Sequence, residues 1–293
     1  MIIGLNSRIR SLIRHRMAPI KGSVMLLKES LQVLPRRFTS RWLWIGTLCV
    51  GLISASMGHV TAEESAMVSE RERVASTITR PYKAEYELSR RGRSHGSAGR
   101  ELSKTEKNGS PQWRYETFSR ASLFILSDRR FNETYFRLHE GQVQPLSFEY
   151  ERRGTGSNRH YSVIFDRENA TLRPTNGDPV AAEWRDDLLD ANAVLHQLQI
   201  DVALGKAETF EYHLIDDDGS LTTYEFAVDK RERIVVNNEQ VETVRVSRVR
   251  DHDRRETYFW FAPEWNYTLV RMQQIEGGRE AALISLKSLT FYD

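Results

Sequence analysis

From Pro81 onward, apolar and polar residues alternate one by one, and this two-residue period restricts the fold more than any other feature. In Tyr82–Leu88 the even-numbered side chains are apolar and the odd-numbered ones are charged. Successive side chains of a β-strand point to opposite faces, so this segment has one buried and one solvated face. The same pattern recurs at Trp113–Phe118, Phe131–Leu138, Val143–Tyr150, Tyr161–Phe165, Phe210–Ile215, Leu221–Val228, Val241–Val249, Thr257–Phe261, Tyr267–Ile275 and Ala281–Phe291. Turn residues separate the segments, which is typical of antiparallel strands.

So many strands do not form a flat open sheet, because twisted sheets of this size curl or split into layers. We therefore predict a mainly β fold, a large curved antiparallel sheet or half-barrel that residues 81–293 form as a single domain. Within residues 187–204 apolar side chains instead recur at helical spacing. Asp186 or Asp187 can cap the start of this helix, and Gly205 can end it. We expect the amphipathic helix to pack on the sheet.

The N-terminal region has the layout of an export signal. An uncharged apolar run, Trp42–Met57, follows a positively charged region, and the small side chains of Val60 and Ala62 come after it. This order is that of a signal peptide and its cleavage site, so we predict a signal over residues 1–62 with cleavage after Ala62. A retained anchor is the alternative, but the run is shorter than the about 20 apolar residues that span a bilayer. We expect no stable membrane span after cleavage, and a flexible polar lead-in over residues 63–80.

The charges are unevenly distributed along the chain. Residues 1–62 hold nine of the 42 Lys and Arg but one of the 40 Asp and Glu, which leaves 33 basic and 39 acidic side chains in the remainder. An acidic mature region argues against nucleic acid as a partner. The single cysteine, Cys49, lies in the apolar run, so the mature region has no disulfide. The positive region is long for a signal, and Met1, Met17 or Met25 would each serve as the start.

Five short stretches of the mature region carry a resemblance to a known family. They are Pro81–Tyr86, Pro145–Tyr150, Asp190–Leu198, Trp260–Pro263 and Leu269–Arg271. In this order and spacing they resemble the domain of unknown function 3108 family of bacterial cell-envelope proteins, over nearly all of residues 81–293. The resemblance implies an exported, periplasmic protein with a barrel-like or strongly curved sheet and, by looser analogy, the half-barrel of lipoprotein carriers. It carries over no catalytic residue, and a shared fold does not establish a function.

Two short motifs have counterparts in catalytic or metal-binding proteins. Gly92–Gly96 matches the G-x-S-x-G turn that exposes a nucleophilic serine, here Ser94, in hydrolases. The polar, extended segment after it lacks the helix of that turn, so we interpret it as a hairpin connection and keep an envelope hydrolase only as a minor alternative. Asp216–Gly219 with Glu225 has the spacing of a calcium loop, but Leu214 would occupy the first ligand position. We interpret this segment as a hairpin turn.

The histidines of the mature region show no paired metal-binding spacing. They are His95, His139, His160, His196, His213 and His252. On the predicted helix His196 directly follows Leu195, so we expect it at the solvated boundary rather than in a ligand set. The carboxylates at the helix start are explained by capping and by the helix dipole. We therefore assign no catalytic residue, no metal ligand and no cofactor, and we predict a non-enzymatic protein.

Large aromatic side chains on the strands are the remaining functional signal. The candidates to line a cavity are Tyr82, Tyr86, Trp113, Tyr115, Phe148, Tyr150, Tyr258 and Trp260. On the inner face of a curved sheet such residues either fill a core or line a pocket, and the sequence leaves both open. The first hypothesis is a binding or carrier protein for an apolar or amphipathic, lipid-like ligand, with the 187–204 helix as a lid. The alternative is a structural or interaction module that meets another envelope protein.

Overall fold

The computed structural model describes residues 62–123, 126–176 and 183–292. The predicted export signal, apart from its last residue, falls within residues 1–61 and so lies outside the described residues. Among the helices that the structure describes, none is long and apolar enough to cross a bilayer.

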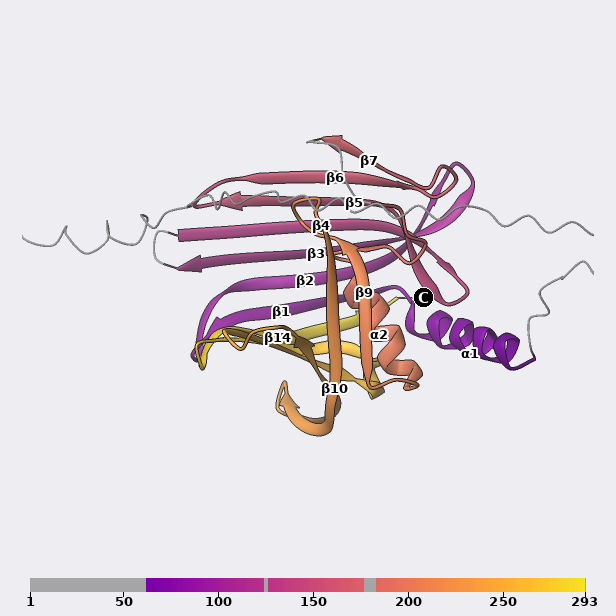
Figure 1. Ribbon diagram of the computed structural model, residues 1–293. Coiled ribbons are helices and arrows are strands. Elements are labelled where there is room, and N and C mark those ends of the chain that lie inside the picture. The colour runs from indigo at the N-terminus through magenta and orange to yellow at the C-terminus, as the bar shows by residue number, and fades with distance from the viewer. Residues whose placement is uncertain (1–61, 124–125, 177–182, 293) are drawn as a thin grey trace, which may run out of the picture. The chain divides into compact units, whose positions relative to one another are not determined.

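One sheet contains most of the described residues (Figure 1). Its 14 strands are β1 (Tyr82–Arg90), β2 (Arg93–Lys107), β3 (Ser110–Leu123), β4 (Leu126–His139), β5 (Gln142–Gly154), β6 (Arg159–Asp166), β7 (Thr171–Asn176), β8 (Leu189–Asp190), β9 (Thr209–Ile215), β10 (Leu221–Val236), β11 (Glu239–Val249), β12 (Arg255–Ala262), β13 (Thr268–Glu276) and β14 (Arg279–Phe291). The helices of the described part are α1 (Ala62–Ile78), α2 (Val194–Leu204) and the short 3₁₀ helix η1 (Pro263–Trp265). The structure confirms the predicted mainly β fold with a large curved sheet.

The strands lie in the order β7-β6-β5-β4-β3-β2-β1-β14-β13-β12-β11-β10-β9-β8. Neighbouring strands pair antiparallel, except that β8 runs parallel to β9. The first and last strands are neighbours in the middle of the sheet, because Tyr82 pairs with Leu102 of β2 on one side and with Phe291 of β14 on the other. Strands β1 to β7 therefore follow one another from the middle of the sheet to one edge, and strands β8 to β14 follow one another from the other edge back to the middle.

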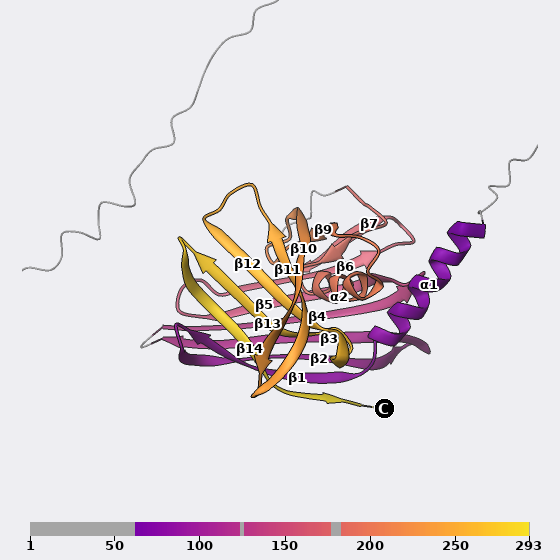
Figure 2. The same cartoon turned by 90° about the horizontal axis from the view of Figure 1, so that it is seen from below.

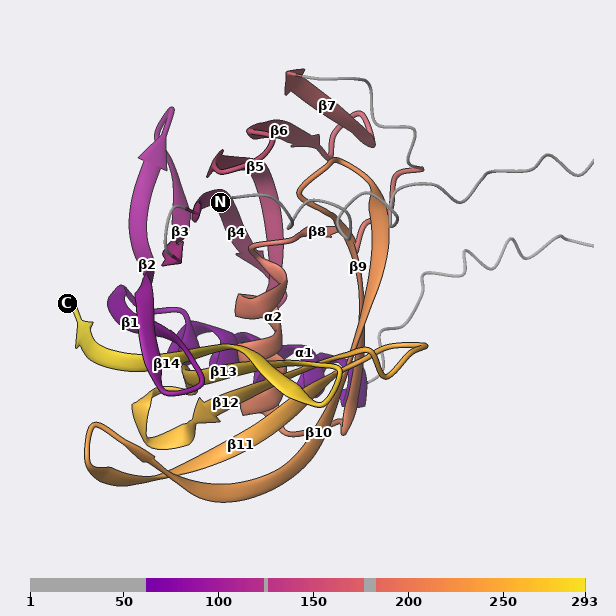
Figure 3. The ribbon, with the colours of Figure 1, turned by 90° about the vertical axis from the view of Figure 1, so that its left-hand side faces the viewer.

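The sheet curves around α2, as Figure 3 shows. Its inner face carries alternating apolar side chains, so that Tyr82, Ala84 and Tyr86 of β1 are all buried. From the opposite side, Leu198 and Ile200 of α2 are fully buried against this face. The helix therefore fills the middle of the curve as part of the core and does not cover it as the predicted lid.

Side-chain packing closes the seam between the two halves of the curved sheet. A second buried cluster joins β5 and β6 to the region of β8 and β9, and its members are Phe148, Tyr150, Tyr161, Val163, Phe165, Leu188 and Ile215. In the β9–β10 turn, Gly219 has a φ of +84° and lies against the ring of Tyr161, where an added Cβ would come within 2.6 Å of Cε2. Close packing of large apolar side chains therefore stabilises the seam.

Helix α2 begins at Val194, later than the predicted start at residue 187. Leu189 and Asp190 extend as β8 along β9, and the Asp190 carboxylate accepts the backbone N–H groups ahead of the helix. The prediction failed because the apolar spacing continues through this short strand, and spacing alone does not show where a backbone leaves the helix. Gly205, with a φ of 66°, ends the helix as predicted.

Residues 62–78 form helix α1, where the polar composition predicted a flexible lead-in over residues 63–80. Figure 2 shows α1 at the end of the sheet where α2 lies. The C-terminal turns of α1 dock there, with Ala75 and Ile78 buried, whereas Met67 is 59% exposed. Tertiary packing stabilises helices that are marginal alone, and composition does not report such contacts.

Candidate functional site

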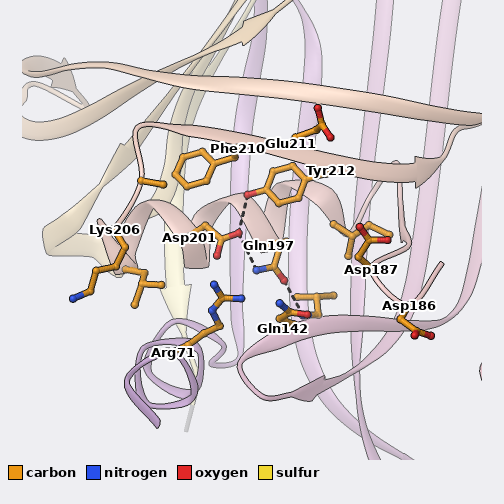
Figure 4. Close-up of a pocket in the computed structure, with 14 residues that line it drawn as sticks. Arg71, Gln142, Asp186, Asp187, Gln197, Asp201, Lys206, Phe210, Glu211 and Tyr212 are labelled. Carbon is orange, nitrogen blue, oxygen red and sulfur yellow. Dashed lines mark hydrogen bonds between the residues drawn. The ribbon is translucent and has the colours of Figure 1, made fainter. Parts of the chain in front are cut away.

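A polar pocket of about 330 Å³ lies between α1, α2, β9 and the start of β5 (Figure 4). It is lined by Arg71, Gln142, Val143, Asp186, Asp187, Leu189, Gln197, Asp201, Leu204, Lys206, Ala207, Phe210, Glu211 and Tyr212. Gln197 and Asp201 lie four residues apart on α2, which places them on one face of the helix. In Figure 4 Arg71 of α1 points toward this pair from the opposite side.

Asp201 is at the centre of the hydrogen bonds in this pocket. Its Oδ2 accepts a hydrogen bond from the Tyr212 hydroxyl at 2.8 Å and one from Gln197 Nε2 at 3.0 Å. Gln197 Oε1 in turn accepts the backbone N–H of Val143 at 2.7 Å. Burial raises the pKa of Asp201, although the two donors and the charge of Arg71 oppose this change. These bonds connect β5, α2 and β9.

The charges at the edge of the polar pocket also have partners within the protein. Asp187 contacts Arg185 at 2.9 Å and His213 at 3.2 Å, and Lys206 contacts Glu70 of α1 at 3.1 Å. Within the described ranges, no group of three or more His, Cys, Asp or Glu side chains is arranged to hold a metal ion. The pocket therefore offers few groups that an incoming ligand would bind without displacing an existing contact.

A second cavity, which we call the arginine hollow, lies on the concave face beside the N-terminal end of α2. It has a volume of about 210 Å³. Its lining is Ala191, Val194, Leu195, Tyr224, Phe226, Arg248, Arg250, Arg255, Thr257, Phe259, Met272 and Gln274. Helix α2 and strands β10, β12 and β13 supply an apolar floor, and three arginines from β11, β12 and the connection between them supply positive charge.

The three arginines of this hollow differ in their partners. Arg255 pairs with Glu276 at 2.7 Å. Arg250 donates to the backbone oxygen of Arg255 and to Thr257 Oγ1, both at 3.3 Å, and the guanidinium of Arg248 lies 3.4 Å from the centroid of the Tyr224 ring. Among the ion pairs of the described residues, none within 4.0 Å joins Arg248 or Arg250 to a carboxylate.

Burial of Arg250 and the positive charges of Arg248 and Arg255 lower its pKa to about 10. Burial is the larger cause of this change, and the two neighbouring arginines add to it because like charges at close range disfavour one another's ionised forms. In addition, Arg248 Nε is buried without a hydrogen-bond partner. A buried donor left unpaired costs free energy.

A smaller inner hollow of about 140 Å³ adjoins the arginine hollow on the same face. It is lined by Tyr86, Ala98, Gly99, Arg100, Thr117, Phe118, Ser119, Arg130, Asn132, Leu269 and Ile284. Ile284 of this hollow and Met272 of the arginine hollow are cross-strand partners, so apolar surface continues between the two. Arg100 Nη1 donates to the Tyr115 hydroxyl at 3.0 Å, and Arg130 pairs with Asp128 at 3.0 Å.

The start of α2, which borders the arginine hollow, is fixed by a buried carboxylate. Asp190 Oδ1 accepts hydrogen bonds from Thr134 Oγ1 at 2.8 Å and from the backbone N–H groups of Asn192 and Ala193 at 2.9 and 2.8 Å. Asn192 Nδ2 donates to the backbone oxygen of Tyr115 at 2.9 Å. Asp190 Oδ2 is buried and has no partner, and burial raises the pKa of Asp190 to about 7.

His196 is fully buried, which corrects the expectation that it lies at a solvated boundary. Its ring centroid lies 5.7 Å from that of Tyr115 and 5.5 Å from that of Phe136, and its Nε2 lies 3.0 Å from Thr79 Oγ1. Burial lowers the pKa of His196 to about 4, so the ring is neutral at neutral pH. The prediction was wrong because α2 is surrounded by the curved sheet and α1, so its polar positions are buried too.

The eight aromatic residues predicted to line a cavity belong mainly to the core. Those that are buried are Tyr82, Tyr86, Tyr115, Phe148, Tyr150 and Trp260, while Trp113 and Tyr258 are partly buried and pack against the core. Tyr86 also lines the inner hollow. The role of these residues in ligand binding stays a prediction.

Sequence reasoning missed the inward-facing arginines, although the alternation contains a signal for them. Val244 and Val246 of β11 are buried, and Arg248 follows at the next position of the same face. In β2, Arg100 stands between the buried residues Ala98 and Leu102. A charged residue at an inward position of an otherwise apolar row indicates a polar site inside the fold.

Both short motifs lie in hairpins, as predicted. Gly92 is in the β1–β2 turn and Ser94 pairs with Ser89 across that hairpin, so Ser94 does not lie on a strand-to-helix turn. Residues 216–220 form the β9–β10 turn, in which the backbone N–H of Asp216 donates to the backbone oxygen of Ser220 at 2.9 Å.

A comparison with solved structures finds matches that include two proteins of low sequence identity. A beta-barrel-like protein of the domain of unknown function DUF1849 from Brucella abortus is 13% identical, with coverage of 73% of this chain and 98% of its own and a TM-score of 0.46. A DUF1329 family protein from Desulfovibrio piger is 10% identical, with coverage of 78% and 92% and a TM-score of 0.26. A comparison with curated proteins finds no match.

A family model matches most of the sheet. It is that of the protein of unknown function DUF3108, and it matches residues 82–281, from the first residue of β1 into β14. Apart from Pro81, the match includes every residue of the stretches that carry the resemblance in the sequence, and it covers more than half of the chain. The chain belongs to the DUF3108 family.

Proposed function

We propose that this protein is an exported, non-enzymatic binding or carrier protein of the bacterial cell envelope, located in the periplasm, and that its ligand is an amphipathic, lipid-like molecule held on the concave face. One observation carries the proposal: the arginine hollow combines a polar margin with a floor formed by Leu195, Phe259 and Met272. Each methylene group that leaves water contributes about 0.8 kcal/mol, so an alkyl chain on this floor would supply most of the binding energy. The layout of the N-terminal segment supports export.

The other features of the structure support binding more than catalysis. Ser94 lies in an ordinary hairpin. In the polar pocket the carboxylate of Asp201 is already hydrogen-bonded to Tyr212 and Gln197. The concave face, by contrast, presents an apolar surface next to polar groups that have incomplete partners, which is the general character of small-molecule binding sites.

The proposal is tested with a neutral 16-carbon probe, hexadecanol, which displaces the fluorescent apolar dye N-phenyl-1-naphthylamine from purified protein. Met272→Gln places an amide on the floor of the hollow, and we expect it to weaken hexadecanol binding about tenfold, because a buried apolar side chain contributes about 1.5 to 3 kcal/mol. Met67→Gln makes the same substitution at a position that is 59% exposed on α1 and should leave binding unchanged.

Two results together would remove the proposal: no dye displacement by any 16-carbon chain, and no lipid extracted from the purified protein. The alternative, a structural module that meets another envelope protein, would then take its place. Equal hexadecanol binding by Met272→Gln and by the unmodified protein would show that the ligand does not bind in the arginine hollow.

A further inference from the structure

Three guanidinium groups converge at the arginine hollow from a short stretch of chain. Arg248 ends the inward-facing row of β11, Arg250 lies in the β11–β12 connection, and Arg255 begins β12. Glu276 neutralises Arg255 at 2.7 Å. The other two cations have contacts only with neutral groups at hydrogen-bonding or ring-stacking distance among the described residues.

This arrangement differs from a row of solvated surface arginines. Arg248 is only partly exposed, its guanidinium lies on the Tyr224 ring, and its Nε is cut off from solvent without a partner. Arg250 is partly buried beside two further cations, and burial together with their charges lowers its pKa. Three carboxylates, those of Glu211, Glu225 and Asp251, border a neighbouring cavity together with Arg248 and Arg250, but none forms an ion pair with either arginine among the described contacts.

The apolar floor begins directly beside these cations. Phe226 is the cross-strand partner of Arg248, and Phe259 and Met272 continue the floor across β12 and β13. From Met272 the apolar surface extends to Ile284 at the inner hollow. Positive charge at one end of an apolar strip is complementary to a molecule with an anionic head and one alkyl chain.

We infer that the arginine hollow binds the anionic head group, a carboxylate or a phosphate monoester, of a single-chain amphiphile, with Arg248 and Arg250 as the head-group ligands and the alkyl chain on the floor from Phe226 to Met272. The inference rests on the proposed function and names its ligand class. Guanidinium groups suit this role because their fixed donors match the paired oxygens of carboxylate and phosphate.

The test compares three 16-carbon probes, palmitate, hexadecyl phosphate and hexadecanol, by displacement of N-phenyl-1-naphthylamine. Inorganic phosphate is the fourth probe, because it carries the charge without the chain. We expect both anionic amphiphiles to bind about tenfold or more tightly than hexadecanol, since hydrogen bonds to charged groups exceed neutral ones in strength. We expect inorganic phosphate not to compete at equal concentration. The tighter of the two anionic amphiphiles identifies the head group.

The double variant Arg248→Gln/Arg250→Gln should lose about tenfold in affinity for the anionic probes and keep its affinity for hexadecanol. Arg254→Gln is the matched control, because it removes one positive charge from the same exposed connection without lining the hollow. If the double variant fails to fold by circular dichroism, Arg250→Gln alone repeats the test at a half-exposed position.

The outcomes separate the inference from the proposed function. Equal affinity for hexadecanol and for both anionic amphiphiles, or unchanged anion binding by the arginine variants, overturns the anionic head group and leaves the carrier proposal standing. Competition by inorganic phosphate as strong as that by hexadecyl phosphate overturns the role of the chain. Absence of binding by all three 16-carbon probes overturns the anionic head group, and together with the absence of extractable lipid it also overturns the proposed function.

Discussion

At the scale of single residues, Asp190 connects the core to the candidate site. Its Oδ1 holds three donors at the start of α2, while its Oδ2 is buried without a partner. A carboxylate without water is costly to ionise, and burial accordingly raises its pKa to about 7. The residue therefore orders the floor of the arginine hollow and also lowers stability whenever it is ionised.

We predict that Asp190→Asn removes this pH dependence. An unfolded chain ionises its aspartates near pH 4, but the folded protein keeps the Asp190 proton to about pH 7. Between these values the folded state binds more protons, so the free energy of unfolding falls as pH rises. The stability of Asp190→Asn relative to the unmodified protein should increase by about 3 kcal/mol from pH 5 to pH 8.

Urea unfolding of both proteins at pH 5, 6, 7 and 8 measures this difference. Both contain His196, whose pKa is lowered to about 4 by burial and whose effect on stability has the opposite sign, so its contribution cancels in the comparison. In the Asp190→Asn variant, the side-chain oxygen of the new amide still accepts hydrogen bonds from the backbone N–H groups of Asn192 and Ala193. A stability difference that is the same at all four pH values would contradict the assignment.

The sequence predicts inward and outward positions at this scale, but not the partners of the side chains. Alternation correctly places Tyr82, Tyr86 and Tyr115 on the inner face. It does not reveal that Arg248 and Arg250 meet beside α2, because this contact depends on how far the sheet curves. The same limit applies to His196, whose burial depends on α1.

At the scale of elements, α1 is stabilised by a small docking surface. Its buried residues, Ala75 and Ile78, lie in the last turns, and Thr79 follows with its hydroxyl 3.0 Å from His196 Nε2. The first half of the helix is mostly exposed. Because short isolated helices are marginal in water, α1 should depend on these contacts.

We predict that Ala75→Asp releases α1 from α2, because a charge at this fully buried position costs more than the small docking surface contributes. Amide hydrogen exchange across residues 69–77 should accelerate at least about tenfold, while exchange in β1 to β5 stays unchanged. Ala66→Asp introduces the same charge at an exposed position of the same helix and should have no such effect. Unchanged exchange in Ala75→Asp would show that α1 does not depend on this docking.

Strands and helices were not equally predictable. Two-residue alternation identifies the strands because each one has a single buried face, and Gly205 identifies the end of α2. Helix α1 was missed because its apolar residues are interspersed with many charged and polar ones, and because the contacts that hold its last turns do not show in the composition. The start of α2 was misplaced because Leu188 and Ala191 fit the helical pattern, whereas Leu189 between them pairs with Leu214 of β9.

At the scale of the whole fold, curvature brings β5 and β6 onto the β9–β10 turn. Tyr161 and Ile215 belong to the buried cluster at this seam, and Gly219 lies against the Tyr161 ring. The strands that meet at this seam lie near opposite ends of the strand order. Their packing therefore depends on the curve of the sheet, which also creates both hollows.

We predict that Gly219→Ala destabilises the protein by about 1 to 3 kcal/mol more than Gly109→Ala. Both glycines have positive φ, +84° and +77°, so both substitutions carry a similar backbone cost of about 1 kcal/mol. Only at Gly219 would the new Cβ meet a ring atom at 2.6 Å, whereas at Gly109 it meets nothing within 4 Å. The measurement is the free energy of unfolding in urea, and equal losses in the two variants would contradict packing at the seam.

The number of strands indicates from the sequence that the sheet must curve, and the structure confirms this. The sequence does not show which strands become neighbours, because every alternating segment offers a similar apolar face. The pairing of β1 with β14 in particular joins the first residues of the family match to residues 283–291, which follow its end.

That pairing has a consequence for biosynthesis. Strand β1 leaves the ribosome early but keeps an unpaired edge until β14, about two hundred residues later, emerges to cover it. Contacts between such distant segments form slowly, because a long loop has to close first. During translation the nascent chain therefore exposes an unpaired backbone edge in β1, a site where a chaperone would protect it from aggregation.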